Sequence, residues 1–340
     1  MTATPATARQ AARDALEGLA LGDAFGERWF KLFRTPAEAF EQIRTRRTPE
    51  EAPWYWTDDT ATALCVYRAL LDYDGIGRDG IGRDGIGRDG IGRTRLAAMF
   101  GATFLADPGR GYGRGMKRLL PVLAEHPQRW KDEAVTLFDG QGSLGNGAAM
   151  RVAPLGAWFA ADLDEAAEQA VHSAEVTHAH PEGIAGAVAV ALAAALAARG
   201  RTDAGGRPGG RPGNAPAGAE LLREVAARTP GGAIREGVTA AADLPAATEP
   251  WRAADLLGSG QRVRASDTVP FALWSAAHHL DSLTDALWTT AEGLGDVDTT
   301  CAITGGVVAA RTGLSGVPAA WRERREELPG WVAHPGVPGE

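Results

Sequence analysis

Helical spacing of apolar residues runs through almost the whole of this chain. Apolar side chains recur three and four residues apart, for example at 63, 64, 67, 70 and 71, whereas a strand would alternate every second residue. Alanine and leucine dominate, and both are strong helix formers. The sequence therefore predicts an all-α fold. The expected helices cover residues 6–21, 36–45, 61–71, 95–106, 116–124, 163–177, 181–199, 219–228, 268–279, 283–294 and 299–311.

Two glycine-rich segments interrupt this helical pattern. Residues 74–93 are four copies of Asp-Gly-Ile-Gly-Arg, and 200–218 are rich in Gly, Pro and Arg. We expect mobile surface loops at 74–94 and 200–218. A calcium-binding repeat is an alternative for the first, but such repeats use nine-residue periods with several acids each. Two acid-rich motifs, one in the first third of the chain and one in the last, are expected to form a single metal site. We therefore predict one domain over 1–340 with two insertions.

Charge and composition exclude several classes of partner. The net charge of −8 and pI near 5.5 argue against a broad electrostatic grip on nucleic acid or an anionic membrane. The apolar stretch 184–198 is shorter than the ~20 residues of a membrane span and predicts a buried helix. Cys65 and Cys301 are the chain's two cysteines, expected to be buried thiols, and the first residues lack the pattern of a signal peptide. These features favour the cytoplasm.

Two acid-rich strings, about 240 residues apart, carry the strongest chemical signal. The first is Trp56-Thr57-Asp58-Asp59-Thr60, and the second is Gly295-Asp296-Val297-Asp298-Thr299-Thr300. Each precedes an apolar helical segment, so helix capping alone could explain either string. Two such helix entrances rarely arise from capping alone. Carboxylate and threonine oxygens are ligands for hard divalent cations, and the strings predict two halves of one metal site.

A glycine-rich segment between the two strings is the third element. Residues 140–145 satisfy the dinucleotide pattern G-x-G-x-x-G, but no convincing strand precedes them and no alternation of strands and helices follows, so we reject a Rossmann fold. A glycine-rich turn leading toward a helix still exposes backbone N–H groups that can cradle a phosphate. A plain loop is the alternative.

Three further motifs are weaker. Residues 107–115 form a turn-rich segment whose two arginines and one tyrosine could meet a nucleotide. His178 and His180 precede the alanine-rich helix without the additional Cys or His partners that a histidine metal site needs, so His178 is expected to hydrogen-bond substrate. His278 and His279 have no partner motif, which favours structural or surface roles.

The order of these elements, preceded by Gly22-Asp23-Ala24-Phe25-Gly26, resembles the ADP-ribosylglycohydrolase family over residues ~15 to ~312. The resemblance implies an all-α, single-domain orthogonal helical bundle with two Mg²⁺ or Mn²⁺ ions. It also implies hydrolytic release of ADP-ribose from a modified protein or small molecule, with no membrane partner. Modified nucleic acid remains an alternative substrate. The implied metal ligands are Thr57, Asp58, Asp59, Asp296, Asp298 and Thr299.

Details within the motifs indicate a branch of that family. Arginine-directed members usually carry an acid where this chain has Gly142, so the resemblance is to the branch acting on serine-linked ADP-ribose, poly(ADP-ribose) and O-acetyl-ADP-ribose. That branch has a mobile glutamate where this chain has Phe30, so the general base is sought among Glu27, Asp58 and Asp59. An arginine-directed hydrolase and a noncatalytic ADP-ribose-binding relative are the alternatives. The substrate-binding residues implied are Gly111, Tyr112, Gly113, Gly142, Ser143, Leu144, Gly145, Asn146 and His178.

Overall fold

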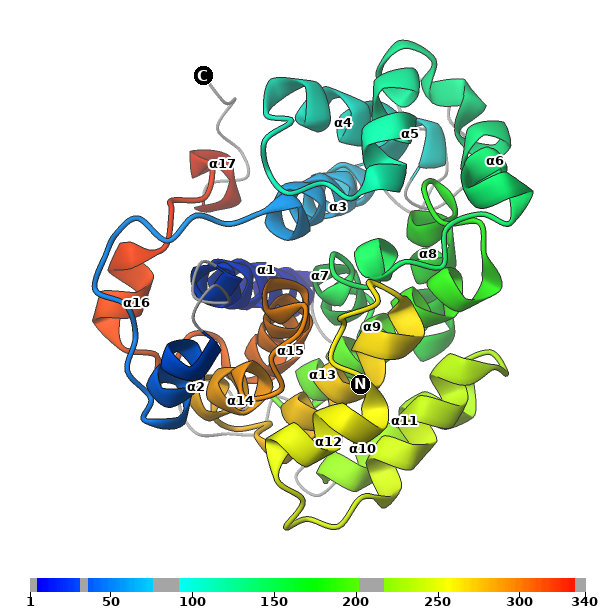
Figure 1. The fold of residues 1–340 in the computed structure, drawn as a ribbon. Coiled ribbons are helices and arrows are strands. Elements are labelled where there is room, and N and C mark those ends of the chain that lie inside the picture. Colours follow the sequence, from blue (N-terminus) through cyan, green and yellow to red (C-terminus); the bar gives the residue numbers. More distant parts are fainter. Residues whose placement is uncertain (1–4, 31–35, 76–91, 202–216, 334–340) are drawn as a thin grey trace.

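The computed structural model describes residues 5–30, 36–75, 92–201 and 217–333, and helices account for most of them (Figure 1). Pairing of extended segments in these ranges is limited to two isolated bridges, Trp54 with Arg325 and Gly145 with Arg264. The predicted all-α fold is confirmed. The α-helices are α1 (Pro5–Phe30), α2 (Pro36–Arg44), α3 (Asp58–Gly75), α4 (Arg93–Ala106), α5 (Arg114–Glu125), α6 (Trp130–Gly140), α7 (Ala153–Trp158), α8 (Leu163–Glu175), α9 (Pro181–Arg199), α10 (Gly218–Arg228), α11 (Ala233–Asp243), α12 (Pro250–Leu257), α13 (Ala265–His278), α14 (Leu283–Ala291), α15 (Val297–Thr312), α16 (Ala319–Arg324) and α17 (Gly330–Ala333), with 3-10 helices η2 (Pro127–Arg129) and η3 (Asn146–Ala148).

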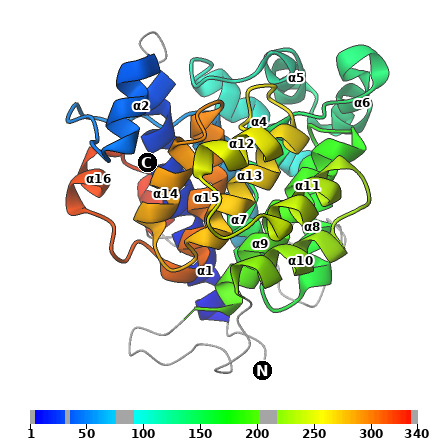
Figure 2. The ribbon, with the colours of Figure 1, turned by 60° about the horizontal axis from the view of Figure 1, so that its bottom comes forward.

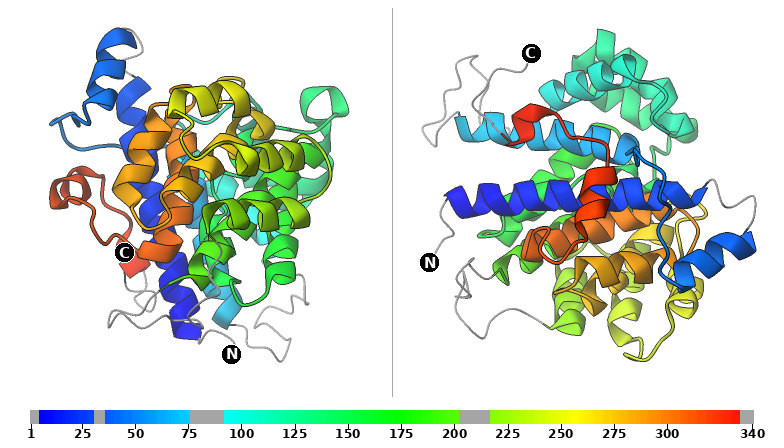
Figure 3. Two further views of the ribbon diagram at one scale, coloured as in Figure 1. Left: turned by 90° about the horizontal axis from the view of Figure 1, so that it is seen from below. Right: turned by 90° about the vertical axis from the view of Figure 1, so that its left-hand side faces the viewer.

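Helices α1 and α15 pack together at the centre of the fold, as the right-hand view of Figure 3 shows. Gly18, Gly22 and Gly26 lie one turn apart on α1, and a Cβ at each would collide with the backbone of α15. Gly305 makes the same contact in the opposite direction, against the backbone of α1. The prediction that the first helix ends at residue 21 is therefore wrong. The glycines that follow residue 21 continue the helix and bring two helix backbones into direct contact.

Replacing Gly22 by alanine is expected to destabilise the protein, because its new Cβ would meet the Cys301 carbonyl. Overpacking of this kind costs about 1–3 kcal/mol of unfolding free energy. Urea unfolding would measure the loss. Gly231→Ala is the matched control, since a Cβ there has no atom within 4 Å. Equal stability of the two variants would show that α1 and α15 can separate without cost.

Helix α9 is the buried helix predicted from the apolar stretch 184–198. It is long and apolar enough to cross a membrane by length and composition, but every residue from Ala185 to Ala198 is buried inside the protein. Helices α7, α8, α10, α13 and α15 pack around it (Figure 2). The prediction of a core helix is confirmed, and the many alanines allow these close helix contacts on all sides.

The structure also differs from expectation in several short elements. Helices α6, α7, α11, α12, α16 and α17 were not predicted. The backbone of α6 leaves helical geometry at 137–139, and α7, α12, α16 and α17 have eight residues or fewer. Most of the predicted loops at 74–94 and 200–218 lies outside the described residues. Their described flanks show that α3 continues to Gly75 and that α4 begins at Arg93. The first predicted loop is therefore slightly too wide at both ends.

Candidate active site

Helix α1 connects the two acid-rich strings. Asp23 is fully buried and accepts hydrogen bonds from the Thr57 N–H (3.1 and 2.9 Å), the Thr60 N–H (3.0 Å) and the Thr60 hydroxyl (2.6 Å). The neighbouring Gly26 lies against the backbone of Asp298 at the start of α15. One turn of α1 thus touches both strings, and the structure brings together segments about 240 residues apart.

The first string forms the entrance of α3. The Asp59 N–H donates to the Thr57 hydroxyl at 3.3 Å, so Thr57 does cap the helix, as its position predicts. The same hydroxyl donates to Asp59 Oδ2 at 3.2 Å, whereas Asp59 Oδ1 is buried without a partner. Capping therefore accounts for Thr57 but leaves a buried carboxylate oxygen of Asp59 unsatisfied. Such an atom is costly unless it binds a proton or a cation.

The second string forms the entrance of α15. Asp296 is the N-cap residue, yet its side chain makes no capping hydrogen bond and instead accepts from the Asn146 amide at 2.7 Å. Asp298 accepts from the Thr299 N–H at 2.7 Å. Capping alone does not explain Asp296. Its contact with Asn146 ties the second string directly to the glycine-rich segment.

Burial and mutual repulsion raise the pKa of the acids in both strings. Burial, with the charges of Asp23 and Asp296, raises the pKa of Asp58 to about 7. Burial also raises the pKa of Asp23 to about 6, despite hydrogen bonds that lower it. The pKa values of Asp59 and Asp298 rise further above their usual range through burial and neighbouring carboxylates. The site therefore concentrates negative charge in a buried place, where a bound cation would relieve the repulsion.

The donor set fits a hard divalent cation. All six predicted ligands offer oxygen, and Asp59 Oδ1 is a buried acceptor with no partner. Among the described residues, no three His, Cys, Asp or Glu side chains already converge closely enough to form a metal cage. The fit therefore rests on the type and burial of these oxygen donors.

The glycine-rich segment lies against the second string. Asn146 and Gly147 open η3, and the Ala265 N–H donates to the Leu144 carbonyl at 3.0 Å, which fixes the segment to α13. Ser143, Leu144 and Gly145 precede the helical turn in extended or bent backbone. Gly142 has a φ of +74°, and a Cβ there would lie 2.8 Å from Ala179 Cβ and His180 N. The backbone conformation and the lack of space both require glycine at this position.

His178 packs against the glycine-rich segment. It is buried, its Nδ1 lies 2.8 Å from the Thr177 hydroxyl, and its ring lies against Gly145 and Gly147. Burial and the positive charge of Arg151 lower the pKa of His178 to about 3, so the ring is neutral at pH 7. The structure thus gives His178 a supporting position. Its predicted hydrogen bond to substrate stays a prediction.

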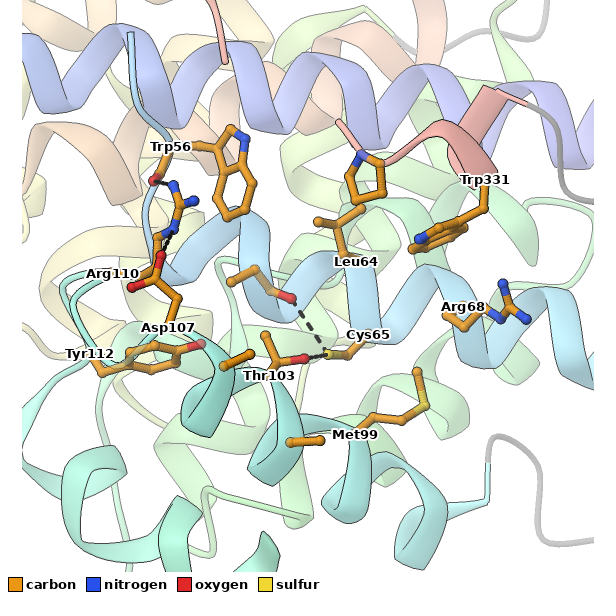
Figure 4. A pocket seen from close by; sticks show the side chains of 14 residues that line it. Trp56, Leu64, Cys65, Arg68, Met99, Thr103, Asp107, Arg110, Tyr112 and Trp331 are labelled. Atoms are coloured by element: carbon orange, nitrogen blue, oxygen red, sulfur yellow. Dashed lines mark hydrogen bonds and ion pairs between the residues drawn. The ribbon is translucent and has the colours of Figure 1, made fainter. Parts of the chain in front are cut away.

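The turn at 107–113 approaches the first string. A Cβ at Gly111, whose φ is +93°, would lie 3.3 Å from Asp58 Oδ1, so this glycine allows close approach to the carboxylate. Tyr112 is buried edge-on against Phe104 and, with Trp56, lines a cavity of about 480 Å³ that none of the predicted metal ligands lines (Figure 4). Gly113 is the N-cap residue of α5. Gly111 therefore lies directly against a predicted metal ligand.

Glu27 follows Gly26 on α1 and is partly buried. The adjacent Gly26 lies against the Asp298 backbone, and the charge of Glu27 contributes to the raised pKa of Asp298. The structure therefore puts Glu27 beside the candidate site from a third helix.

Three residues outside the predicted set also belong to this region. Asp23 orients the first string, and its place in the Gly22–Gly26 motif was the available signal. Phe138 and Val263 are exposed apolar residues with left-handed backbone (φ of +53° for both) beside the glycine-rich segment. The Phe138 ring lies against Gly115 at the start of α5, and Val263 precedes the bridge between Gly145 and Arg264. Strained exposed residues are not visible as such in a sequence.

Comparison with known structures defines the class of fold. A solved structure described as an "ADP-ribosylglycohydrolase-related protein complex" matches with a TM-score of 0.55 at 21% identity, covering 94% of each chain. The sequence model for ADP-ribosylglycohydrolase matches residues 4–334. The chain therefore belongs to the ADP-ribosylglycohydrolase family, a family of ADP-ribosyl hydrolases.

Similarity to individual relatives is partial. Human ADP-ribosylhydrolase ARH3 is 32% identical over 135 residues, 39% of this chain and 33% of the human protein. The ARH3 of Danio rerio is 29% identical over 179 residues, 52% of this chain and 44% of that protein. The chicken ARH3 is 32% identical over 137 residues, 39% of this chain and 32% of its own length. The alignments thus span about a third to under half of these relatives.

Proposed function

We propose that this protein is a metal-dependent hydrolase that releases ADP-ribose from an O-linked acceptor, such as modified serine or O-acetyl-ADP-ribose. The observation that carries the proposal is the meeting of two partly buried, acid-rich helix entrances with a glycine-rich segment, joined by the hydrogen bond from Asn146 to Asp296. Family membership and the partial similarity to ARH3 proteins support it. The same region can thus offer oxygen ligands to cations and backbone N–H groups to a pyrophosphate.

The residues proposed to hold two Mg²⁺ or Mn²⁺ ions are Thr57, Asp58, Asp59, Asp296, Asp298 and Thr299. When bound, such ions supply Lewis acidity and orient oxygen groups of a substrate. Asp23 keeps the first string in place through its bonds to Thr57 and Thr60, and Asn146 holds one oxygen of Asp296. These neighbours set which carboxylate oxygens remain available as ligands.

The rest of the site is proposed to bind ADP-ribose. Backbone N–H groups of 142–147 would meet the pyrophosphate, supported by the neutral ring of His178 beneath them. Phe138 and Val263 would form the apolar walls for the adenine, because both are exposed and both lie beside the glycine-rich segment. Gly111 would let the ribose approach Asp58 closely.

Glu27 is the preferred proton acceptor for the attacking water. Asp58 and Asp59 are the other candidates, but a carboxylate whose charge is neutralised by a metal ion is a weak base. Glu27 lies near the second string without belonging to the proposed ligand set. In the proposed reaction, water gives a proton to this carboxylate as its oxygen bonds to the anomeric carbon and the bond to the acceptor oxygen breaks. The released acceptor oxygen then takes up a proton from the protonated carboxyl or from solvent and leaves as a hydroxyl group.

Gly142 favours an O-linked acceptor over arginine. Arginine-directed relatives were expected to carry an acid at this position, and here a side chain would meet Ala179 and His180. A carboxylate could enter only if this turn moved. An arginine-directed hydrolase and a noncatalytic ADP-ribose-binding protein remain the competing functions.

A side-by-side substrate panel tests the proposal. Purified protein with Mg²⁺ or Mn²⁺ would be incubated with an ADP-ribosylated serine peptide, O-acetyl-ADP-ribose and an ADP-ribosylated arginine peptide, and free ADP-ribose would be measured. We expect release from the first two and little from the third. Preferential release from arginine would support the arginine-directed alternative, and tight binding without release would support the noncatalytic one.

Replacing Phe138 by alanine is expected to weaken ADP-ribose binding by about 5- to 150-fold, because stacking of a base on an aromatic ring contributes about 1–3 kcal/mol. The exposed ring adds little to the core, so the thermal unfolding temperature should change little. Isothermal titration with ADP-ribose would measure the affinity. Trp251→Ala is the control, since Trp251 is a similarly exposed aromatic on α12. Unchanged affinity in Phe138→Ala would exclude Phe138 from the adenine site.

A further inference from the structure

The C-terminal residues 321–326, here called the strap, run beside the segment that leads into the first acid-rich string. The Trp54 N–H donates to the Arg324 carbonyl at 2.6 Å, and the Glu326 N–H donates to the Trp54 carbonyl at 2.9 Å. These bonds form the parallel bridge between Trp54 and Arg325. The right-hand view of Figure 3 shows this C-terminal part of the chain crossing α1. The strap therefore holds the residues immediately before Thr57.

Glu326 of the strap reaches the site through Arg110. Two guanidinium nitrogens of Arg110 donate to the two Glu326 oxygens at 2.6 and 2.8 Å, a bidentate pair that is about four-fifths buried on each side. A third bond goes from Arg110 Nε to Asp107 at 2.7 Å. Charge-assisted bidentate pairs fix the orientation of the guanidinium plane. Glu326 and Asp107 together leave Arg110 little freedom to rotate.

Arg110 in turn contacts both sides of Thr57. Its Nη1 donates to the Trp56 carbonyl at 2.9 Å, and its guanidinium stacks 3.7 Å from the centre of the Trp56 ring. Its own carbonyl accepts from the Asp58 N–H at 2.7 Å. Figure 4 shows Trp56, Arg110 and Asp107 side by side at one end of the cavity. Arg110 thus grips the residues directly before and directly after Thr57.

We infer that Glu326 is a positioning residue for metal binding, because it orients Arg110, which holds Thr57 and Asp58 in place for a cation. The inference rests on the proposed function, since it assigns a role at the same metal site. Glu326 itself touches neither proposed ligand. Hydrogen-bond partners behind the ligands of a metal site typically contribute about 10- to 100-fold in metal affinity.

Glu326→Gln tests this role with little change in shape. The dissociation constant for Mn²⁺ would be measured by isothermal titration of the metal-free protein, and kcat and KM would be measured at saturating Mn²⁺. We expect the dissociation constant to rise about tenfold, with kcat largely restored by excess metal and KM nearly unchanged. Arg110→Lys, which keeps the charge but loses the bidentate geometry, is expected to weaken metal binding in the same direction.

Glu17→Gln is the matched control. Glu17 on α1 pairs with Arg325 of the same strap at 2.9 Å, and this ion pair is buried to a similar degree. Removing it leaves the backbone bonds between the strap and Trp54 and the Arg110–Glu326 pair in place, so Mn²⁺ affinity should stay at the wild-type value. Equal losses in Glu17→Gln and Glu326→Gln, or no loss in Glu326→Gln, would overturn the positioning role.

The same measurements separate this inference from the proposed function. Wild-type protein that binds Mn²⁺ but releases no ADP-ribose would overturn the hydrolase assignment. The Mn²⁺ affinities of Glu326→Gln and Glu17→Gln would still decide the role of Glu326. Wild-type protein that binds neither Mn²⁺ nor Mg²⁺ would overturn both.

Discussion

Replacing Asp298 by alanine is expected to lower turnover by about 1,000-fold or more and to remove most of the affinity for divalent metal. Asp298 opens α15 and lies against Gly26 of α1, so it stands where the second string meets the rest of the site. A lost ligand removes charge stabilisation that contributes several kcal/mol to catalysis. Turnover of the preferred substrate and isothermal titration with Mn²⁺ would measure the two effects.

The stability of a second variant distinguishes this role from a structural one. In Asp298→Asn the shape is kept, while a buried carboxylate repelled by Asp296 and Asp23 is removed. The metal-free variant should therefore be at least as stable as the wild type at about pH 8. Asp281→Asn is the control, because it removes an exposed ion pair with Arg311 on the same helix α15. Wild-type turnover in Asp298→Ala would refute the shared metal site.

Metal-free protein is expected to lose stability as the pH rises from about 4 to about 7. Burial raises the pKa of Asp58 from 3.8 to about 7 and that of Asp23 to about 6. Between the unfolded and folded pKa values the folded state binds more protons, so the unfolding free energy falls with rising pH. This favourable contribution is complete below the unfolded pKa and is lost above the folded pKa. Urea unfolding in EDTA at about pH 5, 6, 7 and 8 would show the trend.

Divalent metal should reverse this trend, because cations bind the charged carboxylates that are repelled in its absence. Saturating Mg²⁺ or Mn²⁺ is expected to raise the thermal unfolding temperature more at about pH 8 than at about pH 5. Asp298→Asn should show both a weaker pH trend without metal and a smaller gain with it. A metal effect that is equal at both pH values in wild type and variant would place the bound cation elsewhere.

The helices with strong periodicity were predictable, and the exceptions have physical causes. The stretch 184–198 forms the buried α9, as its length and composition indicate. Helix α1 continues to Phe30 because close packing against the backbone of α15 offsets the low helix propensity of its glycines. That partner lies almost 280 residues away in the sequence, so local pattern alone could not reveal it. Short helices such as α12 and α16 depend on tertiary packing.

The acids of the candidate site could be predicted from residue type and spacing, but the residues that surround and position them could not. Asp58 and Asp298 lie in dense polar strings before apolar helices. Phe138 and Val263, in contrast, become notable only when their exposure and left-handed backbone are seen. Glu326 has no motif around it, and its connection to Asp58 passes through Arg110, 216 residues earlier in the chain. A contact between residues so far apart in the sequence is visible only in the folded structure.

The glycine contacts between α1 and α15 also bear on how this protein could be redesigned. Because the two backbones touch without intervening side chains, no rotamer change can alter the spacing between them. The distance from α1 to the second string is therefore set by the main chain, whereas the first string is tied to α1 by the Asp23 side chain. In the proposed site, changes at Phe138 or Val263 could then alter the affinity for the adenine without moving the α1–α15 contact. Nucleotide binding and the position of the second string would then be separately adjustable.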